Sequence, residues 1–183
     1  QAIVARLSGK GLSVSEDLEK KYSKHQGVFV TLKKDGDLRG CIGFPLPHNR
    51  LYRAITESAA QAAFSDPRFP PVSAQELDKI SIEISILSVP KRIEIGEKDL
   101  EDKIKVGRDG LIIRSGYRSG LLLPQVFTEY GCTPLQALQM TCQKAGLPPD
   151  AWKDKGAVIE SFQGEVFKET SPKGSVVKED LDS

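Results

Sequence analysis

Six residues near position 40 bring together a guanidinium, a thiol and two glycines. Residues 38–43 read LRGCIG and otherwise have the composition of a β-strand. Because side chains alternate along a strand, we expect Arg39 and Cys41 on one face and Leu38 and Ile42 on the other. Two glycines inside a strand indicate that backbone or ligand approaches closely. The segment therefore predicts an anion-binding group about 7 Å along the strand from a potential nucleophile.

The chemistry open to Cys41 is nucleophilic or redox catalysis. A catalytic thiol needs an electropositive neighbourhood, which Arg39 on the same face could help to supply. Cysteine nucleophiles usually work with a histidine base, and the chain has two histidines, of which His48 follows the strand in a Pro-rich loop. Cys41 is also consistent with a small buried cysteine that packs as a hydrophobe. It is therefore a candidate catalytic residue, with packing as the alternative.

Two arginines and an aspartate form a second candidate site. Arg39 and Arg68 could hold a carboxylate or phosphate through bidentate hydrogen bonds, while Asp66 orients one of them. The alternative is an Arg–Asp pair that ties a loop to the sheet. Both functions are compatible if Asp66 holds Arg39 and leaves Arg68 for a ligand. Gln125, after Pro124 at the end of a predicted strand, is a further candidate ligand-binding residue, although an exposed glutamine at a helix start explains it as well.

The elements that must position these residues begin with a hairpin. Residues 27–32 predict a strand by their β-branched and aromatic content. Residues 34–36 predict a three-residue loop that pairs Leu32 with Leu38, Val30 with Gly40 and Val28 with Ile42. This register places the aliphatic side chains on one face and leaves Phe29 and Thr31 beside Arg39 and Cys41. A two-residue turn at Asp35-Gly36 would scramble this sorting, so we expect the longer loop.

The other elements follow from periodicity and capping signals. The predicted helices cover residues 1–8, 51–63, a short segment after the capping box 73–76, a short segment from 124, and a helix that begins with the capping box 133–136 and ends at Gly146. The predicted strands cover residues 80–86, 103–106, 111–114, 120–123 and 157–167. Residues 66–71 predict a stiff loop, and 168–183 a flexible polar tail.

The strands come in hairpins that helices interrupt, and this pattern favours an α+β fold with a mostly antiparallel sheet and flanking helices over a doubly wound fold. A chain of 183 residues fits one domain with a larger and a smaller lobe. We expect a single domain over residues 1–167, a smaller lobe around 103–124, and a cleft between the lobes. Arg39, Cys41, Asp66 and Arg68 are expected to line this cleft.

Composition excludes several classes of protein. A net charge of +1 gives no global basic footprint for nucleic acid or an anionic membrane. The three cysteines, Cys41, Cys132 and Cys142, lack CxxC spacing, which argues against a disulfide framework or a structural zinc site. No apolar run approaches the ~18 residues of a membrane-spanning helix, and no signal peptide is visible. No dinucleotide or Walker motif is present, so no cofactor and no metal are predicted.

Taken together, these segments resemble the AMMECR-one domain family (AmmeMemoRadiSam system protein A-like) over nearly the whole chain. The matching segments are residues 38–43 after a hairpin, the alanine-rich helix, residues 66–71, 76–77, 80–88, 110–111, 122–126, 142–146 and Trp152. The resemblance implies an α+β domain with a larger and a smaller lobe and with the LRGCIG motif near their junction. It implies no reaction. It does imply association with a Memo-like protein and a radical-SAM protein, and any cluster chemistry would belong to such a partner.

We therefore expect a cytoplasmic domain that acts as an enzyme, or as the substrate-handling partner of one, on a small anionic or nucleotide-like ligand. The candidate residues are Cys41 for catalysis, Arg39, Asp66, Arg68 and Gln125 for ligand binding, and Gly40 and Gly43 as structural parts of the motif. The alternative is a non-catalytic module or scaffold that binds protein or RNA. Nucleic-acid binding has little support, because few aromatic residues interleave the basic positions of residues 103–118.

Overall fold

The structure is a computed structural model that describes residues 1–96 and 98–179. These residues form two compact units, of which unit 1 contains residues 1–89 and 165–179, and unit 2 contains residues 90–164. Each unit combines helices with antiparallel strands, so the predicted α+β class with a mostly antiparallel sheet is confirmed. The predicted cleft between two lobes stays a prediction.

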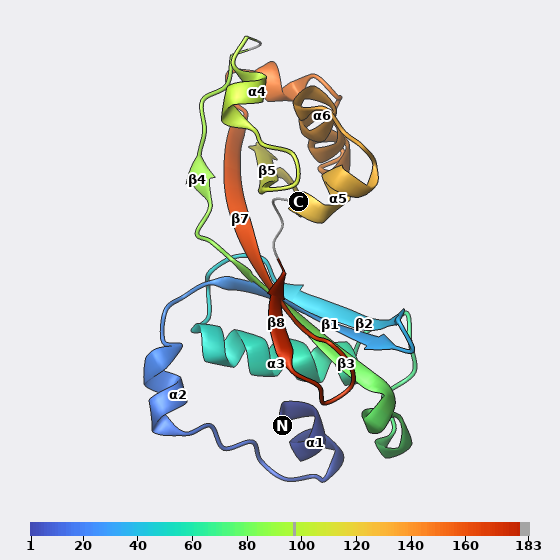
Figure 1. The fold of residues 1–183 in the computed structure, drawn as a ribbon. Coiled ribbons are helices and arrows are strands. Elements are labelled where there is room, and N and C mark those ends of the chain that lie inside the picture. Colours follow the sequence, from blue (N-terminus) through green and yellow to red (C-terminus); the bar gives the residue numbers. More distant parts are fainter. Residues whose placement is uncertain (97, 180–183) are drawn as a thin grey trace. The chain divides into compact units, whose positions relative to one another are not determined.

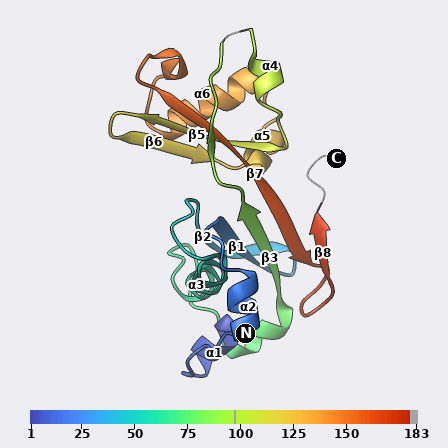
Figure 2. The same cartoon turned by 90° about the vertical axis from the view of Figure 1, so that its left-hand side faces the viewer.

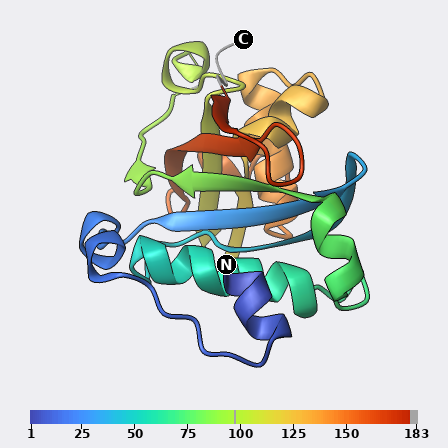
Figure 3. The same cartoon turned by 60° about the horizontal axis from the view of Figure 1, so that its bottom comes forward.

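Unit 1 is built on an antiparallel sheet. Its strand order is β2-β1-β3 followed by β7, and β8 pairs with the end of β7. These strands are β1 (Gly27–Lys34), β2 (Asp37–Phe44), β3 (Ile80–Leu87), β7 (Val158–Glu169) and β8 (Val176–Glu179). The helices of this unit are α1 (Ala2–Leu7), α2 (Glu16–Lys21), α3 (Leu51–Phe64) and the 3₁₀ helix η1 (Ala74–Lys79). Figure 3 shows α3 running along β1 and β2, with α1 beside α3.

The small-residue face of α3 explains how closely this helix packs on the sheet. Ala54, Ala59, Ala62 and Ala63 are buried, and they contact the same core as the buried valines and leucine of β1. A Cβ atom added at Gly40 would lie 2.1 Å from the backbone oxygen of Ala62. The first glycine of the LRGCIG segment is therefore required by helix–sheet contact, as its place inside a strand suggests.

Unit 2 has a separate core. Its central strand β5 (Asp109–Ser115) pairs with β6 (Arg118–Leu122) on one side and with β7 on the other, and the two-residue strand β4 (Lys91–Arg92) also pairs with β7. Figure 2 shows α6 (Pro134–Lys144) lying against β5 and β6. The remaining helices are α4 (Leu100–Lys103), α5 (Pro124–Glu129) and the 3₁₀ helix η2 (Ala151–Lys153). Figure 1 shows β7 as one continuous strand, whose first residues belong to unit 2 and whose last residues belong to unit 1.

The predicted register of the first hairpin is wrong by two residues. The structure pairs Leu32 with Gly40, Val30 with Ile42 and Val28 with Phe44. The turn has two residues, Asp35 and Gly36, whose φ angles of 53° and 91° are both positive, as a type I′ turn requires.

A bulge explains why a two-residue turn does not scramble the aliphatic face. Lys33 pairs with Leu38 but Leu32 pairs with Gly40, so Arg39 is an extra residue on β2. The extra residue restores the alternation, and Val30 and Ile42 still meet on the face of α3. Leu38, before the bulge, is 43% exposed, so its predicted place in the core is wrong.

Two other predicted segments differ from the structure. Residues 103–106 are not a strand, because α4 ends at Lys103 and a turn follows in which the amides of Lys105 and Asp109 are hydrogen-bonded locally. The segment expected to be a flexible tail contributes to unit 1, since β7 extends to Glu169 and β8 covers Val176–Glu179. Residues 180–183 of that tail lie outside the described residues.

Candidate functional site

Cys41 lies in β2, which ends the strand order of unit 1. Its partner across the ladder is Thr31 of β1, whose hydroxyl donates a hydrogen bond to the Cys41 sulfur at 3.2 Å. Cys41 is half-buried. The sequence predicted Thr31 on the same face as Cys41. In the observed register, which is shifted by two residues from the predicted one, Thr31 lies directly opposite Cys41. The thiol therefore sits on the sheet face away from α3, next to a hydroxyl.

The main chain of Cys41 is held by Asp66 and Arg68 from the loop after α3. The Cys41 amide donates to Asp66 Oδ2 at 2.9 Å, and Arg68 Nη2 donates to the Cys41 carbonyl at 3.2 Å. The two loop residues are themselves joined, since Arg68 Nε and Nη2 donate to the Asp66 oxygens at 2.9 and 2.7 Å. A carboxylate and a guanidinium thus replace the main-chain partners that a neighbouring strand would provide.

Burial and charge make this pair strongly asymmetric. The Asp66 side chain is 2% exposed, whereas that of Arg68 is 53% exposed. The hydrogen bond from Arg68, with those from the Cys41 and Arg68 amides, outweighs burial and holds the pKa of Asp66 well below its usual range. The bond to Asp66, together with the neighbouring Cys41, raises the pKa of Arg68. A buried anion therefore holds a half-exposed cation against the main chain of Cys41.

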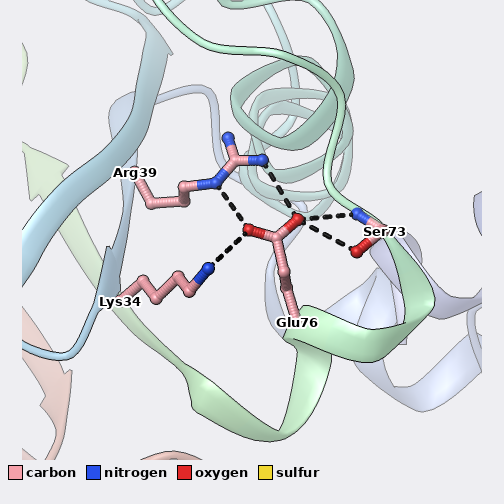
Figure 4. Close-up of polar contacts among 4 residues, drawn as sticks. All are labelled: Lys34, Arg39, Ser73 and Glu76. Carbon is pink, nitrogen blue, oxygen red and sulfur yellow. Dashed lines mark hydrogen bonds and ion pairs between the residues drawn. The ribbon is translucent and has the colours of Figure 1, made fainter.

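Arg39 is held by a different carboxylate, which Figure 4 shows. Arg39 Nε and Nη2 donate to the two oxygens of Glu76 at 3.1 and 3.2 Å. Lys34 Nζ donates to the same Oε1 at 3.1 Å, and the amide and hydroxyl of Ser73 donate to Oε2 at 3.0 and 3.1 Å. Arg39, then the Ser73 amide and Lys34, hold the pKa of Glu76 well below its usual range. The predicted capping box is present, and its carboxylate also binds two cations.

The Arg39 guanidinium is only partly satisfied by these contacts. Its side chain is 10% exposed, and Nη1 is buried without a hydrogen-bond partner among the described residues. A buried polar group left unpaired costs roughly 1–3 kcal/mol. The ring of Phe69, from the same loop as Arg68, has its centroid 5.9 Å from Arg39 Cζ and 5.5 Å from Arg68 Cζ. One aromatic ring is thus close to both guanidinium groups.

Four of the candidate residues lie together in unit 1, and Gln125 belongs to unit 2. Cys41, Asp66 and Arg68 are in direct contact, and Arg39 joins them through Phe69. The expectation that Asp66 holds Arg39 is not met, because Asp66 pairs with Arg68 and Glu76 takes Arg39. Gln125 is half-buried in α5 of unit 2.

Five residues of the cluster lie outside the predicted set: Thr31, Lys34, Phe69, Ser73 and Glu76. Thr31 had a signal in the hairpin register, which named it as a neighbour of the motif. The capping box predicted Glu76 as a helix-capping residue, so the sequence offered no reason to expect it beside Arg39. Its bond to Arg39 joins residues 37 positions apart, and sequence spacing gives no sign of such a pair.

Both glycines of the motif have steric reasons for their identity. A Cβ at Gly43 would lie 2.2 Å from the Val28 carbonyl oxygen and 2.5 Å from a carbon of the Phe29 ring. Gly40 faces the α3 backbone as described above. These contacts fix β2 between β1 and α3, so the position of Cys41 between the glycines is set by packing on both sides.

Across residues 1–96 and 98–179, no three His, Cys, Asp or Glu side chains form a group suited to a metal ion. In the same part of the chain, none of the helices has the length and apolar character needed to cross a membrane.

Comparison with known proteins places this geometry in a family. The AMMECR1 family model matches residues 1–167. A protein of Aquifex aeolicus is 46% identical over 182 residues, which cover 98% of this chain and 93% of that protein. The protein Mbar_A1807 of Methanosarcina barkeri is 49% identical over 165 residues, which cover 90% of this chain and 81% of that protein.

A solved structure agrees with the fold described above. The crystal structure of the uncharacterized protein PH0010 from Pyrococcus horikoshii matches with a TM-score of 0.84 and 42% sequence identity, covering 97% of this chain and 90% of that one. The family model covers most of the sequence and includes every candidate residue. The chain therefore belongs to the AMMECR1 family, as the LRGCIG segment and the motifs after it indicate.

Proposed function

We propose that unit 1 carries a thiol site for a small anionic ligand, in which Cys41 is the reacting group and Arg68 the anion-binding neighbour. The observation that carries this proposal is the half-exposed Arg68 guanidinium, which a buried Asp66 holds against the peptide of Cys41. A cation beside a thiol favours the thiolate, which is the nucleophilic form. The Arg68 side chain is 53% exposed, so an anion from solvent could reach this guanidinium.

The charge balance of the cluster supports an anionic ligand. Lys34, Arg39 and Arg68 are paired with only two carboxylates in these contacts, Asp66 and Glu76. One positive charge is left over in these contacts, and a bound anion would neutralise it. Arg39 is the most buried of the three cations, so solvent would screen its attraction for an anion least.

The setting of this site follows from the family resemblance. We propose that the domain handles its ligand for a larger system, in which a Memo-like or radical-SAM protein supplies further chemistry. We place this activity in the cytoplasm, where the thiol pool keeps cysteines reduced. A nucleotide-like ligand is included in the proposal because its phosphate would supply the anion.

The experiment compares two cysteines of one molecule. Iodoacetamide is added to the folded protein, and peptide mapping follows alkylation of Cys41 and of Cys132, which is also half-buried but lies beside Met140 in unit 2. We expect Cys41 to react at least tenfold faster at pH 7. Arg68→Gln should slow Cys41 without affecting Cys132, and Arg68→Lys, which keeps the charge, should restore part of the rate.

Ligand binding is tested in the same assay. A set of small anionic metabolites and mononucleotides is added before the reagent, and at least one should protect Cys41 selectively. A Cys41 that reacts as slowly as Cys132 in the folded protein contradicts the thiol proposal. The non-catalytic module that binds protein or RNA would then be the better account of the domain.

A further inference from the structure

The remaining N–H groups of Arg39 have no role in the contacts described so far. Nε and Nη2 form the bidentate pair with Glu76, whereas Nη1 is buried without a hydrogen-bond partner among residues 1–96 and 98–179. A lysine could pair with Glu76 through one nitrogen, whereas the Arg39 guanidinium carries a third nitrogen that the bidentate pair leaves unused. Lys34 already makes this simpler contact with the same Glu76 oxygen.

The Glu76 contacts fix the guanidinium without neutralising its surroundings. Five hydrogen bonds from Arg39, Lys34 and Ser73 reach one carboxylate, so the plane of the Arg39 guanidinium is set and Nη1 points away from Glu76, as Figure 4 shows. Lys34 and Arg39 share a single negative charge. The pair therefore retains one positive charge, which can bind an oxyanion.

Phe69 is the group best placed to cover this nitrogen. Its ring lies against the guanidinium groups of both Arg39 and Arg68, and its side chain is only half-buried. The loop backbone around it is fixed, since the Phe69 amide bonds the Asp66 carbonyl at 3.1 Å and the Val72 amide bonds the Ala63 carbonyl at 2.8 Å. A displacement of the ring would therefore require a side-chain rotation and no change in the loop backbone.

We propose that Arg39 is a second ligand-binding residue of the Cys41 site, which binds an oxyanion of the phosphate or carboxylate class through Nη1 when the Phe69 ring moves aside. The inference rests on the proposed function in one respect, that this oxyanion belongs to the ligand handled at Cys41. Phe69 is then the gate between the buried Arg39 and the half-exposed Arg68, and a ligand that displaces the ring contacts both.

The test is a gain of binding, which a misfolded variant cannot produce. Inorganic phosphate and acetate are titrated separately into the full chain by calorimetry. Phe69→Ala should bind one of them at least threefold more tightly than the parent protein, and the arm that responds identifies the class. Arg39→Lys keeps the charge but removes Nη1, and it should weaken binding at least tenfold in both the parent and the Phe69→Ala background.

The matched control is Lys33→Gln, which removes a positive charge from the residue beside Lys34 but leaves Glu76 and Arg39 untouched, since Lys33 pairs with Glu83. Its affinity for either anion should change less than twofold. Should Arg39→Lys fail to fold, the Arg39 Nε–H resonance is followed by ¹⁵N NMR in the parent protein and in Phe69→Ala, and it should shift on addition of the anion.

Three results would overturn the inference. These are no binding of either anion, equal or weaker binding by folded Phe69→Ala, and a gain in Phe69→Ala that persists with Arg39→Lys. Failure of the proposed function looks different, because it appears in the alkylation assay. If Cys41 is alkylated slowly but anion binding depends on Arg39, the oxyanion site is supported and the thiol site is not. If Cys41 is alkylated rapidly but anion binding does not depend on Arg39, only the thiol site is supported.

Discussion

At the scale of single residues, two carboxylates organise the LRGCIG segment. Asp66 binds the Cys41 amide and the Arg68 guanidinium, and Glu76 binds the Ser73 amide and two cations. Each therefore joins a main-chain amide to an arginine side chain. Because both carboxyl groups have lowered pKa values in the folded protein, folding favours their ionised forms.

The first prediction concerns acid sensitivity. A carboxyl group with a depressed pKa in the folded state stabilises the protein above its unfolded pKa, which is about 4 for a glutamate, and this stability is lost as the pH falls below that value. Between pH 7 and pH 3, Glu76 should account for a loss of about 2 kcal/mol in the free energy of unfolding. Urea unfolding at both pH values should show a smaller loss for Glu76→Gln than for the parent protein.

The control for this measurement is Asp78→Asn, because Asp78 forms an ion pair with Lys173 in which both side chains are more than 70% exposed. Exposed pairs contribute little, so its pH dependence should match that of the parent protein. Identical slopes for Glu76→Gln and the parent would show that Glu76 titrates normally in the folded state.

At the scale of elements, the close approach of β2 to α3 depends on Gly40. Adding a Cβ there meets the Ala62 carbonyl, which belongs to a helix backbone and cannot move like a flexible side chain. We expect Gly40→Ala to lower the free energy of unfolding by about 3 kcal/mol in urea titrations. Gly11→Ala is the matched control, since a Cβ at Gly11 has no atom within 4 Å, and its stability should change by less than ~0.5 kcal/mol. A tolerated Gly40→Ala would mean that α3 shifts along the sheet.

The cap on the outer edge of β2 gives a second prediction at this scale. Asp66 and Arg68 satisfy the Cys41 amide and carbonyl, which would otherwise be open to pairing with another chain. Asp66→Ala should lower stability by about 2 kcal/mol, because it removes the hydrogen-bond partner of the Cys41 amide. Hydrogen exchange measured by NMR should accelerate at the Cys41 amide more than at Val30, which faces the interior of the sheet. Equal acceleration at both sites would point to global unfolding instead.

Sequence reasoning succeeded for elements whose signals are local. Strict alternation in β3, the small-residue face of α3 and the capping box of α6 all predicted elements that the structure contains. The sequence did not predict the six-residue α2, because this helix has no buried residue and therefore no apolar periodicity. The bulge at Arg39 allows a two-residue turn while the aliphatic side chains of both strands stay on the core face. This requirement depends on how the two strands pair, so it could not be seen in either strand alone.

The candidate site shows the same division between local and long-range information. Cys41, Asp66 and Arg68 could be named because a thiol, a carboxylate and guanidinium groups near glycines and prolines are chemically conspicuous. Their pairing could not be named, because either arginine fits Asp66 equally well on the basis of type. The loop geometry decides, since Arg68 lies two residues from Asp66 and bonds it without long-range closure.

At the scale of the whole molecule, the two units have hydrophobic cores with no residue in common within positions 1–96 and 98–179. Leu32 belongs to the core of unit 1, with Val30 and Ala62, whereas Leu138 belongs to that of unit 2, with Phe127. Among the described elements, β7 contributes residues to both units. Separate cores joined by a strand are expected to open as separate cooperative units under native conditions.

Hydrogen exchange of two core variants tests this expectation. Leu32→Ala and Leu138→Ala each remove a side chain that is at most 1% exposed, so each should cost about 2–5 kcal/mol in its own unit. Amides of β1 and β3 should lose protection in Leu32→Ala, and those of β5 and β6 in Leu138→Ala, while the other unit changes less. A uniform loss across all protected amides in both variants would show that the chain unfolds as one unit. The Cys41 site would then depend on the stability of unit 2 as much as on its own sheet.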